Sequence, residues 1–175
     1  MTTSDGTIEL GLSLGSNLGD RLHQLQTATS RVLEVPGTKL VAKSPIYETE
    51  PVGVRPEYQD LAYYNCVLVI QSPDSAGDWL TELQTIEADM GRVRGDDRFS
   101  PRPIDIDILF AGDECVDGKD LSVPHPRWAK RRFVVCPLAD VKPDLVLPGQ
   151  HKTVSEVMQD LSEDGEAVQR IVEVW

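Results

Sequence analysis

Two aspartates at alternating positions are the residues of this sequence best suited to chemistry. Asp105 and Asp107 alternate with isoleucines over residues 104–108. Successive side chains of a β-strand point to opposite faces, so both carboxylates would share one face, roughly 7 Å apart at Cα, with the isoleucines on the other. Neighbouring carboxylates repel each other unless a cation lies between them, and Mg²⁺ is commonly held by one or two carboxylates plus substrate phosphates. The pattern therefore predicts a magnesium site. The alternative is a solvent-facing strand, although Asp is a poor strand former.

A cluster of arginines stands just before this aspartate pair. Its members are Arg92, Arg94, Arg98 and Arg102. Guanidinium groups fork onto phosphate oxygens, and metal-holding acids beside such groups indicate phosphoryl or nucleotidyl transfer. The alternative is a set of solvated surface arginines.

The charge distribution favours an anionic ligand for these arginines. The chain of 175 residues has 29 acidic and 17 basic residues, for a net charge of −12. Nine of the bases and eight of the acids lie within residues 92–132, so this stretch carries +1 and the remainder −13. A chain this acidic is not expected to bind nucleic acid.

No familiar phosphate-binding motif accompanies the cluster. GxxxxGK[ST] matches nowhere, GxGxxG follows no predicted strand, and the protein-kinase signatures are absent. His125, between two prolines, suits a positioned phosphate contact, although a lone His is more often structural. Tyr63, Tyr64 and Phe133 are candidate faces for a flat heterocycle, although aromatic residues more often belong to the core.

The composition predicts a single domain over residues 1–175 with a cytoplasmic location. No apolar run approaches the roughly 20 residues of a membrane span, so no membrane contact is expected. Residues 1–7 lack a signal-peptide pattern. Cys66, Cys115 and Cys136 are far apart and form no CxxC pair, which favours reduced thiols over disulfides or zinc.

The elements that must position these residues follow the order strand, helix, strand, strand, helix, strand. This order predicts a ferredoxin-like α+β fold, a mainly antiparallel sheet with packed helices. The predicted elements are strand 7–14, a helix from 21 to 33 capped by Asn17 or Asp20, strands 38–47 and 63–71, helix 75–90 ended by Gly91, and strand 104–110.

Less regular segments connect and follow this core. Two long loops, 48–61 and 92–103, are long enough to be functional. Residues 113–116 are expected to pair back onto strand 104–110, and a turn over 124–132 to become a short helix. Residues 133–137 are short and apolar. A helix over 154–161 and a final strand over 167–175 complete the prediction.

Ordered motifs from about Ile8 to Pro148 give the chain a specific likeness. It resembles 6-hydroxymethyl-7,8-dihydropterin pyrophosphokinase of folate biosynthesis. The motifs are Leu14–Asp20, Ser44–Thr49 with Pro51–Gly53, Tyr64-Asn65, Glu87–Arg94, Pro101–Asp107, Val123–Pro126 and Arg131–Val134.

This resemblance implies transfer of the β,γ-diphosphate of ATP to the pterin hydroxymethyl group, with release of AMP. It implies two Mg²⁺ ions held by Asp105 and Asp107, with Arg92 and Arg102 as further catalytic residues. The implied ATP-binding residues are Gln84, Glu87, Arg92, Arg94, Arg102, Ile108, His125 and Arg131. The implied pterin-binding residues are Thr49, Pro51, Gly53, Tyr63, Asn65 and Phe133. The implied partners are ATP and the pterin, and we expect a monomer.

Some features depart from the family pattern or leave alternatives open. Phe99 stands where the family usually has Trp, and Ser100 where it usually has Gly. The loop before Asn65 is a few residues longer than in the family, so either Tyr63 or Tyr64 can be the stacking residue. Gly15–Asn17 are interpreted as structural support. The rival functions are a two-metal nucleotidyltransferase and a non-catalytic ferredoxin-like module.

Overall fold

A six-stranded antiparallel sheet forms the centre of the computed structural model, which describes residues 5–51, 54–93, 95, 97, 100–161 and 167–175. Its strand order is β5-β1-β4-β3-β8, and β2 also pairs with β4. The strands are β1 (Ile8–Ser16), β2 (Lys39–Lys43), β3 (Ile46–Thr49), β4 (Tyr63–Ser72), β5 (Asp105–Ala111) and β8 (Val168–Val172).

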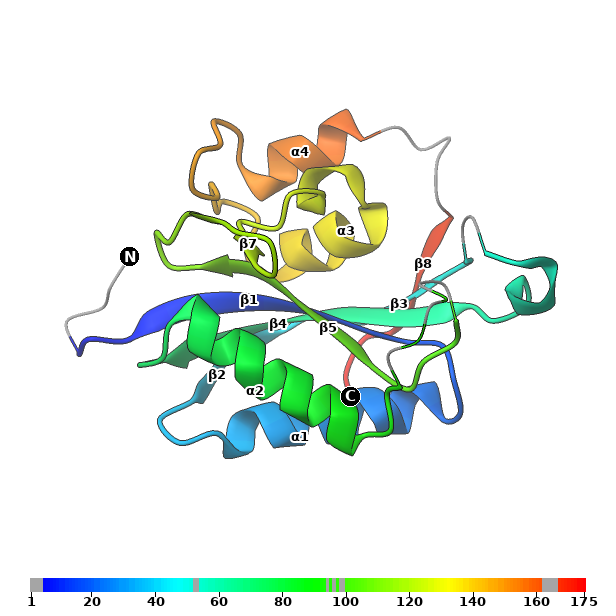
Figure 1. Ribbon diagram of the computed structural model, residues 1–175. Coiled ribbons are helices and arrows are strands. Elements are labelled where there is room, and N and C mark those ends of the chain that lie inside the picture. Colours follow the sequence, from blue (N-terminus) through cyan, green and yellow to red (C-terminus); the bar gives the residue numbers. More distant parts are fainter. Residues whose placement is uncertain (1–4, 52–53, 94, 96, 98–99, 162–166) are drawn as a thin grey trace.

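Helices cover both faces of this sheet (Figure 1). Helices α1 (Arg21–Glu34) and α2 (Ala76–Asp89) lie on one face, and α3 (Arg132–Val141) and α4 (Val154–Asp160) lie on the other. The shorter elements are the 3₁₀ turns η1 (Pro56–Tyr58) and η2 (Trp128–Lys130) and the hairpin of β6 (Val116–Asp117) and β7 (Ser122–Val123).

The central strands are apolar on both faces because each face must pack against a helical layer. Along β4, Cys66, Leu68 and Ile70 join the core under α1 and α2, whereas Val67 and Val69 join the core under α3. Side-chain alternation thus creates two cores from one strand. The same alternation decides which face each polar residue of the sheet reaches.

The predicted fold class is confirmed by this antiparallel α+β arrangement. The first helix is capped as one of the two predicted options: the Asp20 side chain accepts a hydrogen bond from the backbone N–H of His23. The second ends before Gly91, whose φ of 90° favours glycine. That residues 1–175 form a single domain stays a prediction.

The predicted strand 38–47 is wrong in one respect: it is two strands. β2 ends at Lys43 and β3 begins at Ile46, because Pro45 between them has no N–H to offer a ladder. Ser44 replaces the missing pairing, since its N–H donates to the Val67 carbonyl and its Oγ accepts from the Val67 N–H.

The pairing predicted for residues 113–116 is also wrong. Residues 116–117 pair with 122–123 in a separate hairpin, so the edge of β5 is not covered by this segment. The short apolar segment 133–137 lies within α3, which begins just after η2. Its run of apolar residues fits a helix that packs on the sheet, as Val134, Val135 and Leu138 show by their burial. Within the described residues, no helix is long and apolar enough to cross a membrane.

Candidate functional site

A cavity of about 520 Å³ opens on the α3 side of the sheet. Three neighbouring strands, β1, β4 and β5, supply part of its wall, and the segment from His125 to Phe133 supplies another part. The lining residues are Ser13, Gly15, Thr49, Glu50, Pro51, Val54, Tyr63, Asn65, Arg92, Arg102, Asp105, Asp107, His125, Arg127, Arg131 and Phe133.

Strand alternation decides between the two candidate tyrosines. Tyr63 and Asn65 share the face of Val67 and line the cavity. Tyr64 points to the other core, where the Arg21 guanidinium carbon lies 3.7 Å from the centre of its ring. The tyrosine on the cavity wall is therefore Tyr63.

Gly15 lets two strands approach closely beside this wall. It faces Asn65 across the β1–β4 ladder, and a Cβ at Gly15 would lie 2.9 Å from the Asn65 Oδ1 atom. Such a contact is too short for an ordinary side chain, so Gly15 leaves room for the Asn65 amide. That amide donates a hydrogen bond of 2.7 Å from Nδ2 to Thr49 Oγ1.

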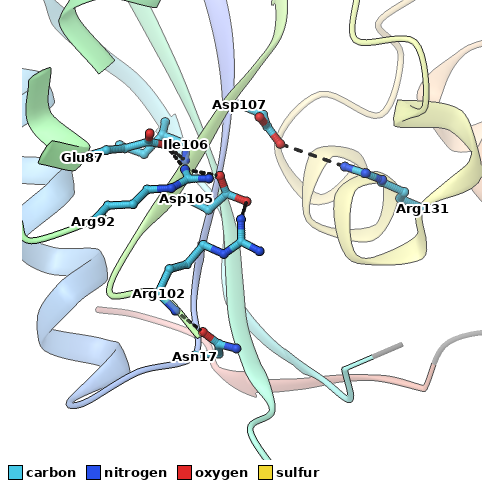
Figure 2. A network of polar contacts seen from close by, with 8 residues as sticks. All are labelled: Asn17, Glu87, Arg92, Arg102, Asp105, Ile106, Asp107 and Arg131. Atoms are coloured by element: carbon cyan, nitrogen blue, oxygen red, sulfur yellow. Dashed lines mark hydrogen bonds and ion pairs between the residues drawn. The ribbon is translucent and has the colours of Figure 1, made fainter. Parts of the chain in front are cut away.

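The two aspartates lie on the cavity face of β5, as the alternation predicts, while Ile106 and Ile108 are buried in the core under the helices α1 and α2. Asp105 lies between two guanidinium groups (Figure 2): Arg92 Nη1 is 2.6 Å from its Oδ1, and Arg102 Nη1 is 3.7 Å from its Oδ2.

Asp107 has a weaker partner. Arg131 Nη1 lies 4.0 Å from its Oδ2, and desolvation followed by repulsion from Asp105 raises the pKa of the Asp107 carboxyl. Because the charged form of Asp107 is disfavoured as it stands, a cation between the two carboxylates would stabilise it.

Arg92 and Arg102 are each held in place by a neighbouring residue outside the cavity wall. Arg92 Nη1 also lies 2.6 Å from Oε1 of Glu87, a residue of α2 that is only 3% exposed. Burial opposes the charge on Arg92, but Asp105 and Glu87 outweigh it and raise the pKa of the guanidinium. Asn17 holds the backbone of Arg102, because its Oδ1 accepts the Arg102 N–H at 2.9 Å.

His125 is held as a neutral ring. Its backbone N–H donates to the Leu109 carbonyl of β5, and its Nδ1 accepts the backbone N–H of Arg127 at 3.1 Å. Burial, followed by the charges of Arg131 and Arg127, lowers the pKa of His125 to about 4. Near pH 7 the proton is therefore on Nε2, which makes this atom a hydrogen-bond donor.

Two aromatic rings line the same cavity from different layers. Tyr63 comes from β4, where burial raises the pKa of its hydroxyl group. Phe133 comes from the first turn of α3, packs against the second core, and has the Arg131 guanidinium carbon 5.5 Å from its ring centre. Flat aromatic ligands stack on such faces.

Most of the residues predicted for the site line this cavity, but not all do. Gln84 is exposed on α2, Glu87 is buried behind Arg92, and Ile108 is buried in the core, so none of these three is part of the wall. The predictions for Gly53 and Arg94 lie outside the described residues, as does Phe99.

Sequence reasoning missed several residues of the wall. Ser13, Glu50, Val54 and Arg127 line the cavity, and so does Gly15, which was interpreted as structural support. Ser13 and Gly15 pair directly with Asp107 and Asp105 across the β1–β5 ladder. Only the strand pairing brings these residues together, whereas Arg127 had a local signal, two positions after His125.

The donor set fits a cation that brings its own additional ligands. Among the described residues, no group of three or more His, Cys, Asp or Glu side chains gathers at a possible metal position. Asp105 and Asp107 supply two carboxylates, and phosphate oxygens would have to complete the coordination shell. Mg²⁺ accepts this combination.

Comparison with known proteins adds a family match. Residues 11–143 match the family model described as 7,8-dihydro-6-hydroxymethylpterin-pyrophosphokinase. A 2-amino-4-hydroxy-6-hydroxymethyldihydropteridine pyrophosphokinase of Pseudomonas aeruginosa is 41% identical over 141 residues, which cover 80% of this chain and 85% of that protein. The protein with the same description from Haemophilus influenzae is 34% identical over 152 residues, which cover 87% and 92% of the two chains.

Longer proteins contain a similar unit. The folic acid synthesis protein fol1 of Schizosaccharomyces pombe is 37% identical over 155 residues, which cover 88% of this chain but 20% of fol1. Among solved structures, the wild-type HPPK-DHPS of Plasmodium falciparum with pteroate superposes with a TM-score of 0.67 at 17% identity. The match covers 87% of this chain and 42% of that chain, and it supports the fold alone.

Proposed function

Because this chain belongs to the 7,8-dihydro-6-hydroxymethylpterin-pyrophosphokinase family, we propose that its cavity holds ATP phosphates and a pterin side by side. The enzyme transfers the β,γ-diphosphate of ATP to 6-hydroxymethyl-7,8-dihydropterin and releases AMP, a step of folate biosynthesis. One observation carries the assignment of the cavity: the aspartates, the arginines and two aromatic rings line the same space.

Asp105 and Asp107 are the residues that would hold two Mg²⁺ ions bound with ATP. These ions would neutralise charge on the transferred phosphoryl groups. The support for this assignment is the shared strand face of the two carboxylates and the raised pKa of Asp107.

Arg92, Arg102 and Arg131 then stabilise the negative charge that spreads over the phosphate oxygens during transfer. His125 donates its Nε2–H to a phosphate oxygen as a neutral ring, without adding a positive charge to those of the arginines. The sequence-based assignment of Arg94 to ATP, and that of Gln84 and Ile108, remain predictions.

The pterin is held between Tyr63 and Phe133, and the Asn65 and Thr49 side chains bind its polar edge. Pro51 borders the ring, and the assignment of Gly53 to the pterin remains a prediction. In this position the hydroxymethyl oxygen attacks the β-phosphorus and the bond from that phosphorus to the α,β-bridging oxygen breaks. AMP leaves with the bridging oxygen, and the hydroxyl proton is released to water. Positioning of the two substrates supplies much of the rate.

Analysis of the products from ATP and hydroxymethyl dihydropterin tests the reaction. Chromatography of the nucleotides and ³¹P NMR of the pterin are expected to show AMP and a pterin diphosphate in equal amounts. ADP would indicate single phosphoryl transfer. Pyrophosphate would indicate attack at the α-phosphorus, as in a nucleotidyltransferase, and no product would indicate a binding module.

A cytoplasmic location is consistent with the three free cysteines. A monomer is consistent with the small number of exposed large apolar side chains among the described residues. An acidic surface at net charge −12 supports the proposal that nucleic acid and membranes are not partners.

A further inference from the structure

We propose that Glu87 is a positioning residue: it keeps the Arg92 guanidinium on the phosphates when the Asp105 carboxylate exchanges its contact with Arg92 for one with a bound cation. This inference rests on the proposed function, because it assigns Arg92 to the phosphate chain. Glu87 itself would touch neither substrate.

Glu87 bridges a helix, a loop and the strand that carries the aspartates (Figure 2). Its Oε1 accepts a hydrogen bond of 2.8 Å from the backbone N–H of Ile106 and one of 2.6 Å from Arg92 Nη1. Within the described residues β5 is the edge strand of the sheet, so no strand among them pairs with the outward N–H of Ile106, and the Glu87 carboxylate takes that place.

The same residue also holds the start of the loop. The Arg92 backbone N–H donates to the Glu87 carbonyl at 3.0 Å. Arg92 is thus fixed to the end of α2 at both its main chain and its side chain. A guanidinium has five N–H donors, and Arg92 uses those of Nη1 on Glu87 and Asp105, which leaves others for an anion in the cavity.

Binding of the metal and ATP changes the contacts of Arg92. A cation on Asp105 competes with Arg92 for the same carboxylate. Glu87 is 3% exposed and lies outside the cavity wall, so it keeps its contact with Arg92 during this exchange. A buried carboxylate without a counter-charge is costly, so loss of the Arg92 contact would also be unfavourable for Glu87.

A direct role of Glu87 on the nucleotide, which the family resemblance implies, fits this geometry poorly. Its carboxylate points to the Ile106 N–H and to Arg92, and almost none of its surface is accessible. The two roles differ in the kinetic constant that they affect. A positioning role lowers kcat through Arg92, and a direct contact weakens ATP binding.

The experiment compares Glu87→Gln, Arg92→Ala and the double variant, with Glu82→Gln on the same helix as a matched control. Gln keeps an acceptor for the Ile106 N–H and loses the charge that holds Arg92. We expect Glu87→Gln to keep its melting temperature and to lower kcat about tenfold, which is about 1.4 kcal/mol. The Kd of a non-hydrolysable ATP analogue, measured by calorimetry, should change less than about threefold, and the double variant should be no slower than Arg92→Ala.

Several results would overturn the inference. One is an unchanged kcat of Glu87→Gln. Another is a double variant in which the losses of kcat multiply. A third is a raised Kd of the ATP analogue at normal kcat. A drop in melting temperature large enough to explain the lost rate would make Glu87 only a fold residue. The proposed function is judged separately, because it fails when the wild-type protein releases no AMP, whatever Glu87→Gln does.

Discussion

The Asp105 carboxylate contacts two guanidinium groups, and Asp107 lies beside a third, so each carboxylate of the pair has an arginine near it before any ligand enters. Arginines that are held by carboxylates are already in place beside the proposed phosphate position. Preorganised charges of this kind need little rearrangement during the reaction.

The metal assignment predicts the behaviour of Asp105→Asn and Asp107→Asn. Both changes keep the side-chain volume, so the fold should survive with a similar melting temperature. Loss of a Mg²⁺ ligand should lower kcat at least about a hundredfold, because the ion is worth several kcal/mol of transition-state stabilisation. Chelation of Mg²⁺ by EDTA should stop the wild-type enzyme in the same way. Full activity of either variant would contradict the assignment.

Phe133→Ala tests the pterin assignment. If Phe133 is a stacking face, its removal should weaken pterin binding about tenfold and leave the Kd of the ATP analogue nearly unchanged. Calorimetry with each ligand separately measures both effects. If the ring only fills the core under α3, the main result will instead be destabilisation by about 3–5 kcal/mol. Equal weakening of both ligands would also count against stacking.

The lowered pKa of His125 predicts that the free energy of unfolding depends on pH. Its pKa is about 4 in the folded protein and near its usual 6.5 in the unfolded chain. Between these values the unfolded chain binds a proton that the folded protein does not, so stability is lost as the pH falls from 6.5 towards 4. Urea unfolding from pH 7 to pH 4.5 should show a steeper loss for wild type than for His125→Asn. Parallel curves would show that His125 does not titrate this way.

Among the elements, β8 is the one that fixes the edge of the sheet next to Thr49, a proposed pterin-binding residue. It pairs with β3 in a register that places Val168 opposite Thr49. Arg170 of β8 donates hydrogen bonds to the Tyr47 hydroxyl oxygen of β3 and to Asp140 of α3, and the Tyr47 hydroxyl donates to Asp140. One strand is thereby tied to a neighbour in the sheet and to the helix above it.

Arg170→Met is expected to loosen this connection. The Arg170 side chain is 42% exposed, so solvent screening limits the loss to about 1 kcal/mol of unfolding free energy. Urea denaturation measures it, and Asp140→Asn should have a similar effect, with less than additive loss in the double variant. Lys152→Met is the matched control, because its ion pair with Asp160 is exposed on both sides. An equal effect of the control would contradict the proposed connection.

At the scale of the whole molecule, two helical layers enclose the sheet, but they do so differently (Figure 1). Helices α1 and α2 cover one face with a continuous core that includes Leu10, Leu12 and Leu14 of β1. On the other face, α3 covers Val67 and Val69, and the cavity lies on the same face beside them. The two aspartates therefore stand on a strand of the sheet, which holds them more precisely than a loop would.

The sequence by itself determined the side of the sheet on which the aspartates lie. An alternation of polar and apolar residues over 104–108 has one solution in a strand, because the backbone places successive side chains on opposite faces. Composition and element order were likewise sufficient for the antiparallel α+β class, and the ordered motifs were sufficient for the family. The same alternation that places Asp107 on the cavity face buries its neighbour Ile108 in the core.

Only the tertiary structure decided which distant residues meet. Tyr63 rather than Tyr64 lines the cavity because the pairing of β4 with β1 sets its face, and Ser13 joins Asp107 through the pairing of β1 with β5. Glu87 reaches Arg92 and Ile106 because α2 packs against the edge strand. Such contacts depend on packing between segments far apart in the chain, and local patterns carry no signal for them.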